Sequence, residues 1–175
     1  PGLDTRPTSA RVRQALFNIW QGSIGDCRWL DLCSGSGAMG AEALCRGAKT
    51  VVGIERSHAA CRIISQNWTQ VAGTSQTFQL LQGDVIQQLA TLAGQKFDRI
   101  YFDPPYAGGL YQSVLSAIEQ LDLLAPSGEL AVEHSPDPQI GNLPDSLTAL
   151  ALCRYKRYGN TAISFYQFDD SQRND

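Results

Sequence analysis

A carboxylate, two prolines and an aromatic residue follow one another at Asp103-Pro104-Pro105-Tyr106. The apolar run before them, 97–102, predicts a buried strand that stops at Asp103, because neither proline can donate a hydrogen bond to a sheet. The resulting corner aims two acceptors, the Asp103 carboxylate and the Pro104 carbonyl, at one point. Such acceptors can hold the hydrogens of a planar amine, for example a nucleobase amino group. They then favour a pyramidal nitrogen that can attack a methyl donor, and they stabilise the charge that develops.

The other features of this corner suit the same chemistry. Asp103 can take the proton that the amine releases. Tyr106 offers a flat face on which a base can stack, provided that the base is unpaired or flipped out of its helix. Taken alone, a D-P-P-Y sequence also fits an ordinary proline turn after a strand. Its position downstream of a glycine-rich loop favours the catalytic interpretation, with Asp103, Pro104, Pro105 and Tyr106 as the catalytic residues.

A glycine-rich loop joins an expected strand to an expected helix in the segment 30–40. Its spacing, Gly35-x-Gly37-x-x-Gly40, matches the dinucleotide fingerprint, in which glycines allow a sharp turn and a close approach to the ligand. The spacing alone fits nicotinamide cofactors and S-adenosylmethionine equally well. Asp31, just before the loop, favours S-adenosylmethionine, because a carboxylate repels a pyrophosphate but attracts a cationic amine and a sulfonium.

Two further carboxylates lie where the next expected strands end. Glu55 follows the loop by about twenty residues, a spacing at which an acidic side chain can accept both ribose hydroxyls. Asp84 can accept from an adenine amino group beside the apolar Val85, and it can also cap a helix. Open α/β sheets bind ligands at the carboxyl ends of their strands, so we expect these side chains to meet there. The expected cofactor residues are Asp31, Ser34, Gly35, Gly37, Glu55, Arg56, Asp84 and Val85.

Short apolar runs alternate with helical patterns along the chain. The runs predict buried strands, and the patterns predict helices with one apolar stripe. The expected strands cover 29–33, 51–54, 78–81, 100–102 and 130–132, and the expected helices cover 38–46, 58–71, 85–92 and 110–124. This alternation predicts parallel strands joined by right-handed crossovers, and hence a Rossmann-like, doubly wound α/β sheet. Glu133 stands at the end of the fifth expected strand, from which it can face the site.

The two ends of the chain depart from this alternation. Thr8 can cap an opening helix that has an apolar face over 12–20. Near the other end, 147–158 and 161–168 are strand-like and separated only by Gly159-Asn160, which predicts a β-hairpin. We therefore expect one methyltransferase domain over 1–175, with an N-terminal helical segment, 1–22, a cofactor and catalytic core, 23–135, and a C-terminal β-hairpin, 145–169.

The composition is that of a folded domain, with 43% hydrophobic and 18% charged residues. No apolar run is long enough for a membrane span and the first residues lack the features of a secretory signal, so we expect a cytoplasmic protein. The five cysteines contain no C-x-x-C pair and the two histidines share no ligand-like spacing with them. We expect small buried thiols and neither a disulfide framework nor a metal site. The lack of an obvious interface helix favours a monomer.

The net charge of −3 is unlike that of a protein that binds nucleic acid through bulk positive charge. Basic residues nevertheless cluster near both ends of the chain, and these clusters fit either solvated faces or local contacts with a nucleic acid. They are Arg6, Arg11 and Arg13 near the start, and Arg154, Lys156 and Arg157 near the end.

Several of these segments together resemble the RsmD family, which comprises bacterial small-subunit ribosomal RNA guanine methyltransferases. The segments that carry the resemblance are 6–8, 11–13, 15–18, 31–40, 103–106 and 160–166. The resemblance implies a class I methyltransferase fold with seven strands, the last of them antiparallel. It implies methyl transfer from S-adenosylmethionine to the exocyclic N2 amino group of a guanine in 16S rRNA, within a small subunit or an assembly particle. Arg11, Arg13 and Tyr106 would then contact the substrate, and the basic N-terminal hairpin usual in the family is missing from 1–175.

Other activities fit parts of the pattern. Amino-methylation of adenine or cytosine in DNA uses the same corner, although there is no room here for a domain that reads a DNA target. Methylation of a protein glutamine is usually associated with Asn at the position of Asp103. A nicotinamide-dependent oxidoreductase is supported only by the glycine spacing and Glu55. A non-catalytic RNA-binding module would agree with the basic ends but leaves the Asp103 corner unexplained.

Overall fold

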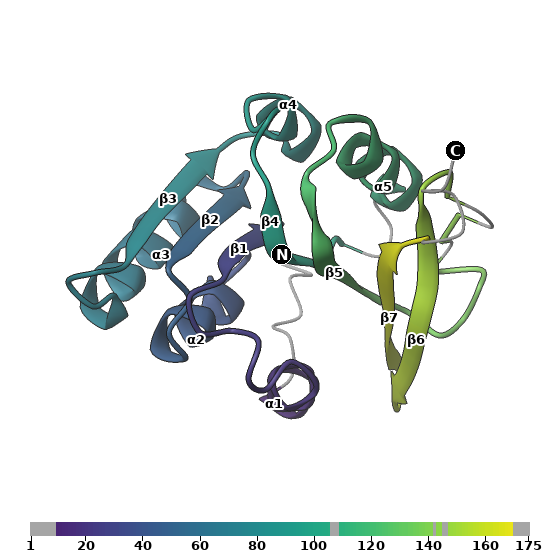
Figure 1. The fold of residues 1–175 in the computed structure, drawn as a ribbon, viewed down its shortest axis with the longest axis horizontal. Coiled ribbons are helices and arrows are strands. Elements are labelled where there is room, and N and C mark those ends of the chain that lie inside the picture. The colour runs from purple at the N-terminus through teal and green to yellow at the C-terminus, as the bar shows by residue number, and fades with distance from the viewer. Residues whose placement is uncertain (1–9, 106–108, 142, 145–146, 170–175) are drawn as a thin grey trace.

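Seven strands form a single mixed sheet in the order β3-β2-β1-β4-β5-β7-β6 (Figure 1). The structure is a computed structural model that describes residues 10–105, 109–141, 143–144 and 147–169. The five parallel strands are β1 (Arg28–Leu32), β2 (Thr50–Glu55), β3 (Thr77–Gln82), β4 (Phe97–Phe102) and β5 (Leu124–His134). They are followed by β6 (Leu150–Tyr158) and β7 (Thr161–Phe168), which are antiparallel to each other. β7 also runs antiparallel to β5, so the expected antiparallel last strand is confirmed.

Helices cover both faces of the sheet. They are α1 (Ala10–Ile19), α2 (Ala38–Cys45), α3 (His58–Val71), α4 (Val85–Ala90) and α5 (Leu110–Gln120). In Figure 1, α4 and α5 lie above the sheet, whereas α1 and α2 lie below it. α3 shares an apolar layer with α1 and α2. This three-layer arrangement confirms the predicted doubly wound α/β fold.

Each face of the sheet buries its own apolar layer. Under α4 and α5 the layer contains Leu30, Leu32 and Ile100, and under the other helices it contains Trp29 and Trp68, all of them fully buried. Neighbouring residues of a strand alternate between the two layers because side chains alternate across a sheet. Strands buried on both faces are apolar along their whole length, which is why they appear in the sequence as short continuous apolar runs.

Two sequence-based expectations about these elements are wrong. The helix expected over 110–124 ends at Gln120, because Asp122 turns the chain with a positive φ of 52° and Leu124 already begins β5. The cysteines are not all small buried thiols, since Cys45 and Cys153 are exposed. Cys153 lies where the β6–β7 register shifts, between Leu152 and Arg154. Within the described ranges, no helix is long and apolar enough to cross a membrane.

Candidate active site

Four carboxylates gather around the Cys33 thiol at the carboxyl edge of the sheet. They come from the ends of four neighbouring strands, β3, β2, β1 and β4, and are Asp84, Glu55, Asp31 and Asp103. Burial raises the pKa of Cys33 to about 12, and the negative charges of Glu55, Asp103, Asp31 and Asp84 act in the same direction. Cys33 therefore stays a neutral thiol, and the surrounding site favours a cationic ligand.

Asp31 is the most buried of these carboxylates. Its side chain is 1% exposed, and Oδ2 accepts a hydrogen bond from the Gly40 amide of α2 at 3.2 Å. Burial is the main cause that raises the pKa of Asp31 to about 7, and the nearby charge of Glu55 acts in the same direction. A ligand cation beside Asp31 would favour the ionised carboxylate. This carboxyl group can therefore couple cation binding to proton release near neutral pH.

Glu55 ties the glycine-rich loop to the start of α3. Its Oε2 accepts from the Gly35 amide at 2.8 Å, and its Oε1 accepts from the Ser57 amide at 2.7 Å. Ser34 shapes the same loop, since its hydroxyl donates to the Asp31 carbonyl at 2.9 Å. Each carboxylate oxygen has a second lone pair, so a half-buried Glu55 can still accept from ligand hydroxyls. Arg56, the next residue, is exposed.

The loop glycines serve the packing of the loop as well as its approach to a ligand. Gly35 has a φ of +56° and open space where a Cβ would lie, with only the Cys33 carbonyl at 3.8 Å. Gly37 has a φ of +73°, and a Cβ there would come within 2.8 Å of Ile64. At Gly40 a Cβ would overlap the ring of Trp68. Gly35 thus faces open space, whereas Gly37 and Gly40 make room for α3.

Trp68 supports the glycine-rich loop from the α3 side, a role that no sequence pattern indicates. The ring is completely buried, and its Nε1 donates to the Gly37 carbonyl at 2.8 Å. Trp68 and Gly37 are 31 residues apart, on α3 and at the start of α2. No local pattern connects two residues at this separation. The one available signal is that a buried tryptophan needs a partner for its N–H group.

Asp84 caps α4 and lies at the edge of the site. Its Oδ1 accepts from the Ile86 amide at 3.0 Å and from the Gln87 amide at 3.2 Å. The helix-capping alternative is therefore realised, and both of these bonds use the same oxygen. Val85 is 6% exposed and packs into the apolar layer under α4 and α5, so most of its side chain belongs to the core.

The end of β4 lies beside the end of β1, which brings the proline corner next to the glycine-rich loop. Leu32 pairs with Phe102, and the Asp103 amide donates to the Leu32 carbonyl at 3.4 Å. Asp103 is half-buried, Pro104 is buried and Pro105 is exposed. The fourth expected catalytic residue, Tyr106, lies outside the described residues. Parallel pairing of β1 with β4 thus unites two motifs that are about seventy residues apart in the sequence.

Glu133, near the end of β5, is hydrogen-bonded to one residue before the proline corner and to one residue after it. Its side chain is 5% exposed, and Oε2 accepts from the Tyr101 hydroxyl on β4 at 2.5 Å. Its backbone carbonyl accepts from the Tyr111 hydroxyl on α5 at 3.3 Å. Position at a strand end suggested that Glu133 could face the site, but neither tyrosine contact could be read from the sequence. β5 is thereby linked to both β4 and α5 on either side of the corner.

The two arginines expected to contact the substrate lie on the first turn of α1. Arg11 is exposed and Arg13 is half-buried, while Val12 and Leu16 between and beyond them pack against the sheet. Arg6, the third arginine of the N-terminal cluster, and Thr8, the expected helix cap, lie outside the described residues. Arg11 and Arg13 therefore flank the buried stripe of α1.

Within the part of the chain that the structure describes, the two histidines belong to no metal-binding group. Among the described residues, no three His, Cys, Asp or Glu side chains are arranged to hold a metal ion. The ring of His134 is hydrogen-bonded to the Ser135 carbonyl at 2.7 Å and to the Ser164 hydroxyl at 2.9 Å. Burial lowers the pKa of His134. His58 is exposed at the first residue of α3.

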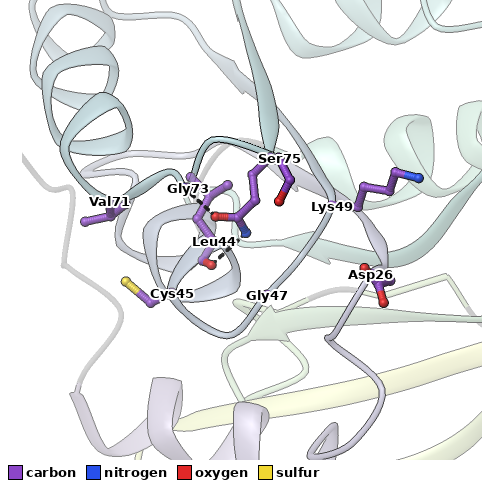
Figure 2. Close-up of a pocket in the computed structure, with 9 residues that line it drawn as sticks. Asp26, Leu44, Cys45, Gly47, Lys49, Val71, Gly73 and Ser75 are labelled. Carbon is purple, nitrogen blue, oxygen red and sulfur yellow. Dashed lines mark hydrogen bonds between the residues drawn. The ribbon is translucent and has the colours of Figure 1, made fainter.

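A hollow of about 540 Å³ lies at the opposite edge of the sheet, before β2 and β3 begin (Figure 2). Gln76 spans its wall: Nε2 donates to the carbonyls of Leu44 and Ala48, and Oε1 accepts from the Gly73 amide. These bonds satisfy the Gln76 amide within the fold. The hollow is thus a structural junction between α2, α3 and β3, away from the four carboxylates.

Comparisons with known proteins agree with this fold. The family model described as Conserved hypothetical protein 95 matches residues 1–167. Ribosomal RNA small subunit methyltransferase D of Escherichia coli is 32% identical over 168 residues, which cover 95% of this chain and 80% of that protein. The enzyme of the same name from Haemophilus influenzae is 28% identical, over 93% of this chain and 82% of its own length.

Solved structures show the same architecture. "Putative methyltransferase yhhF from Escherichia coli" superposes with a TM-score of 0.81 and 30% identity, over 94% of this chain and 87% of that one. SMU.776, solved in complex with SAH, shares the fold at a TM-score of 0.71 and 14% identity, over 89% of this chain and 48% of that one.

The fold and the site define a Rossmann-like methyltransferase that depends on S-adenosylmethionine. The chain belongs to the family described as Conserved hypothetical protein 95, together with its relatives, the ribosomal RNA small subunit methyltransferases D.

Proposed function

We propose that this chain transfers a methyl group from S-adenosylmethionine to the exocyclic N2 amino group of a guanine in small-subunit (16S) rRNA. The observation that carries the proposal is the gathering of Asp31, Glu55, Asp84 and Asp103 around Cys33 at the edge shared by β1 to β4. Its support comes from relatives named as small-subunit rRNA methyltransferases. Guanine and its N2 position rest on the family resemblance.

The residues of the glycine-rich loop and its neighbours fit S-adenosylmethionine. The cofactor supplies an electrophilic methyl group on a positively charged sulfur, and it carries an amino acid ammonium as well. The buried Asp31 carboxyl and the negative surroundings of Cys33 suit those cations. We assign cofactor binding to Asp31, Ser34, Gly35, Gly37, Glu55, Arg56 and Asp84, with Val85 contributing the exposed part of a mostly buried side chain.

At the proline corner, Asp103 and Pro104 position the amine. The Asp103 carboxylate and the Pro104 carbonyl accept hydrogen bonds from the guanine amino group and hold its lone pair in the direction of attack. Asp103 then accepts the proton that the amine loses. Pro105 stiffens the corner, and Tyr106 stacks on the base, which must be unpaired or flipped out to enter.

We further propose that Arg11 and Arg13 contact the RNA and that the chain acts as a monomer with a single domain. The RNA substrate is 16S rRNA within a small subunit or an assembly particle. An rRNA substrate would place the protein in the cytoplasm of a bacterium. Both arginines lie on α1, where Arg11 is exposed and its guanidinium is available to a phosphate.

Replacement of Asp103 tests the catalytic assignment. In Asp103→Ala the amine loses an acceptor, so methyl transfer to unmodified small subunits should fall by about 10²–10⁴-fold. Binding of S-adenosylhomocysteine, measured by calorimetry, should persist. Asp122→Asn is the matched control, because it removes an exposed carboxylate beyond α5 and Asn tolerates the positive φ of 52°. Wild-type turnover by Asp103→Ala would contradict the assignment.

A further inference from the structure

The β6–β7 hairpin has a charge opposite to that of the protein as a whole. Its residues 150–168 include Arg154, Lys156 and Arg157 and no aspartate or glutamate. The hairpin therefore carries a formal charge of +3 in a chain of −3, so the remaining residues sum to −6. A protein of this net charge repels RNA at a distance, so attraction has to come from local positive surface.

The hairpin lies at the outer edge of the sheet and points toward the active-site edge. β6 pairs only with β7 in the sheet order, which leaves its other edge without a strand among the described residues (Figure 1). Ala162, just after the Gly159-Asn160 turn, pairs with His134 at the carboxyl end of β5. The turn and the last residues of β6 are therefore at the same end of the sheet as the carboxylates around Cys33. RNA that enters the active site can continue along this strand.

The basic side chains of β6 are accessible. Lys156 and Arg157 are exposed, and Arg157 Nε donates to the Gly159 carbonyl at 3.1 Å, which holds its guanidinium at the turn. Among the described residues, Arg154 is the one of these three cations that forms an ion pair. Its guanidinium nitrogen is 3.6 Å from a Glu129 carboxylate oxygen. Tyr155, with 48% of its surface exposed, lies on the same face of β6 as Arg157, because side chains alternate along a strand. Arg154 and Lys156 lie on the opposite face, where Arg154 packs over Phe165. The edge strand therefore presents cations on both of its faces and an exposed aromatic ring beside Arg157, and cations next to aromatic rings bind RNA backbone and bases.

We infer that the β6–β7 hairpin is a docking surface for the RNA phosphate backbone, separate from the pocket that holds the reacting base. Lys156 and Arg157, on opposite faces of the edge strand, contact successive phosphates of RNA that passes over this edge, and Tyr155 offers a face for an unpaired base beside Arg157. The inference rests on the proposed RNA substrate. It explains how a protein of net negative charge holds RNA after the target base has entered the pocket.

The test compares two variants that have the same reduction in positive charge. Lys156→Ala/Arg157→Ala removes two of the three hairpin cations, and Lys49→Ala/Arg62→Ala removes two exposed cations, one just before β2 and one on α3. Binding of 16S rRNA is measured at several salt concentrations, together with kcat, KM and calorimetry with S-adenosylhomocysteine. In the hairpin variant, KM should rise with kcat and thioether affinity unchanged. The slope of log K against log salt should become shallower by about 1 for each phosphate that the RNA-bound protein no longer neutralises.

Equal salt slopes for the two variants would overturn the inference. So would a hairpin variant that no longer binds assembled particles but still binds naked 16S rRNA, since a protein partner would then occupy the surface. Failure of the proposed function has a different signature: the wild type would methylate no form of 16S rRNA, whereas the salt slope of RNA binding would still depend on Lys156 and Arg157.

Discussion

The proposed cofactor and catalytic site depends on four single carboxylates. Asp31, Glu55, Asp84 and Asp103 stand out in the sequence by their position at or after apolar runs, and the structure brings them together around Cys33. Their meeting could be predicted because parallel strands end at one edge of a sheet. Their hydrogen bonds could not, because these depend on where backbone amides of other segments lie. The two amides bonded to Glu55, Gly35 N and Ser57 N, are examples.

Asp31 should make cofactor binding depend on pH. Burial raises its pKa to about 7 in the folded protein, so the ligand-free carboxyl group holds a proton at lower pH. A cationic ligand binds the ionised form better, and affinity for S-adenosylmethionine should therefore increase as pH rises through about 7. Calorimetry across this pH range, in buffers of different ionisation enthalpy, should also show proton release on binding. An affinity that stays flat over the range would contradict the prediction.

The stability of the ligand-free protein should change with pH in the opposite sense. The ordinary pKa of this carboxyl group is 3.8, and its folded value of about 7 is higher, so the folded state binds the extra proton between them. The contribution of Asp31 to the free energy of unfolding therefore falls as pH rises through this window. Asp31→Asn provides the control for both measurements, since it cannot titrate and its cofactor affinity should be lower and independent of pH near neutrality.

Helices and strands set the positions of these side chains through contacts that are distant in sequence. Apolar periodicity predicted the alternation of strands and helices, and the Gly159-Asn160 turn predicted the hairpin that the structure contains. The end of α5 was misplaced, because Leu121, Leu123 and Leu124 extend an apolar pattern that a left-handed Asp122 interrupts. The support of the loop by Trp68 was also missed, because α3 approaches α2 only in the folded sheet.

Gly40→Ala should weaken both the fold and cofactor binding. The added Cβ would overlap the buried Trp68 ring and push α3 away from the glycine-rich loop, at a cost of about 1–3 kcal/mol in the free energy of unfolding. Urea denaturation measures that cost, and calorimetry with S-adenosylhomocysteine measures the decrease in affinity. Gly25→Ala is the control, because a Cβ at Gly25 meets nothing within 4 Å. Equal stability of the two variants would show that α3 does not support the loop.

In the molecule as a whole, the four carboxylates and the basic hairpin turn lie at the same edge of the sheet. The parallel strands β1 to β4 deliver the carboxylates there, and the hairpin brings its cations to the same end. The proposed substrate, small-subunit rRNA, is the one that the name of the Escherichia coli relative states for that enzyme, and the matched region covers 80% of that relative. The net charge of −3 could be read from the sequence. The edge of the sheet at which the basic end of β6 lies could not, because it follows from the antiparallel pairing of β7 with β5.

The most direct test of the proposed activity is to map the product. Small subunits that lack the modification are incubated with the protein and S-adenosylmethionine, and the 16S rRNA is digested and analysed by mass spectrometry, with duplex DNA as a parallel substrate. We expect a single N2-methylguanine in the rRNA, formed by the wild type and not by Asp103→Ala. A methyl group on adenine or cytosine, or transfer to DNA in preference to rRNA, would contradict it.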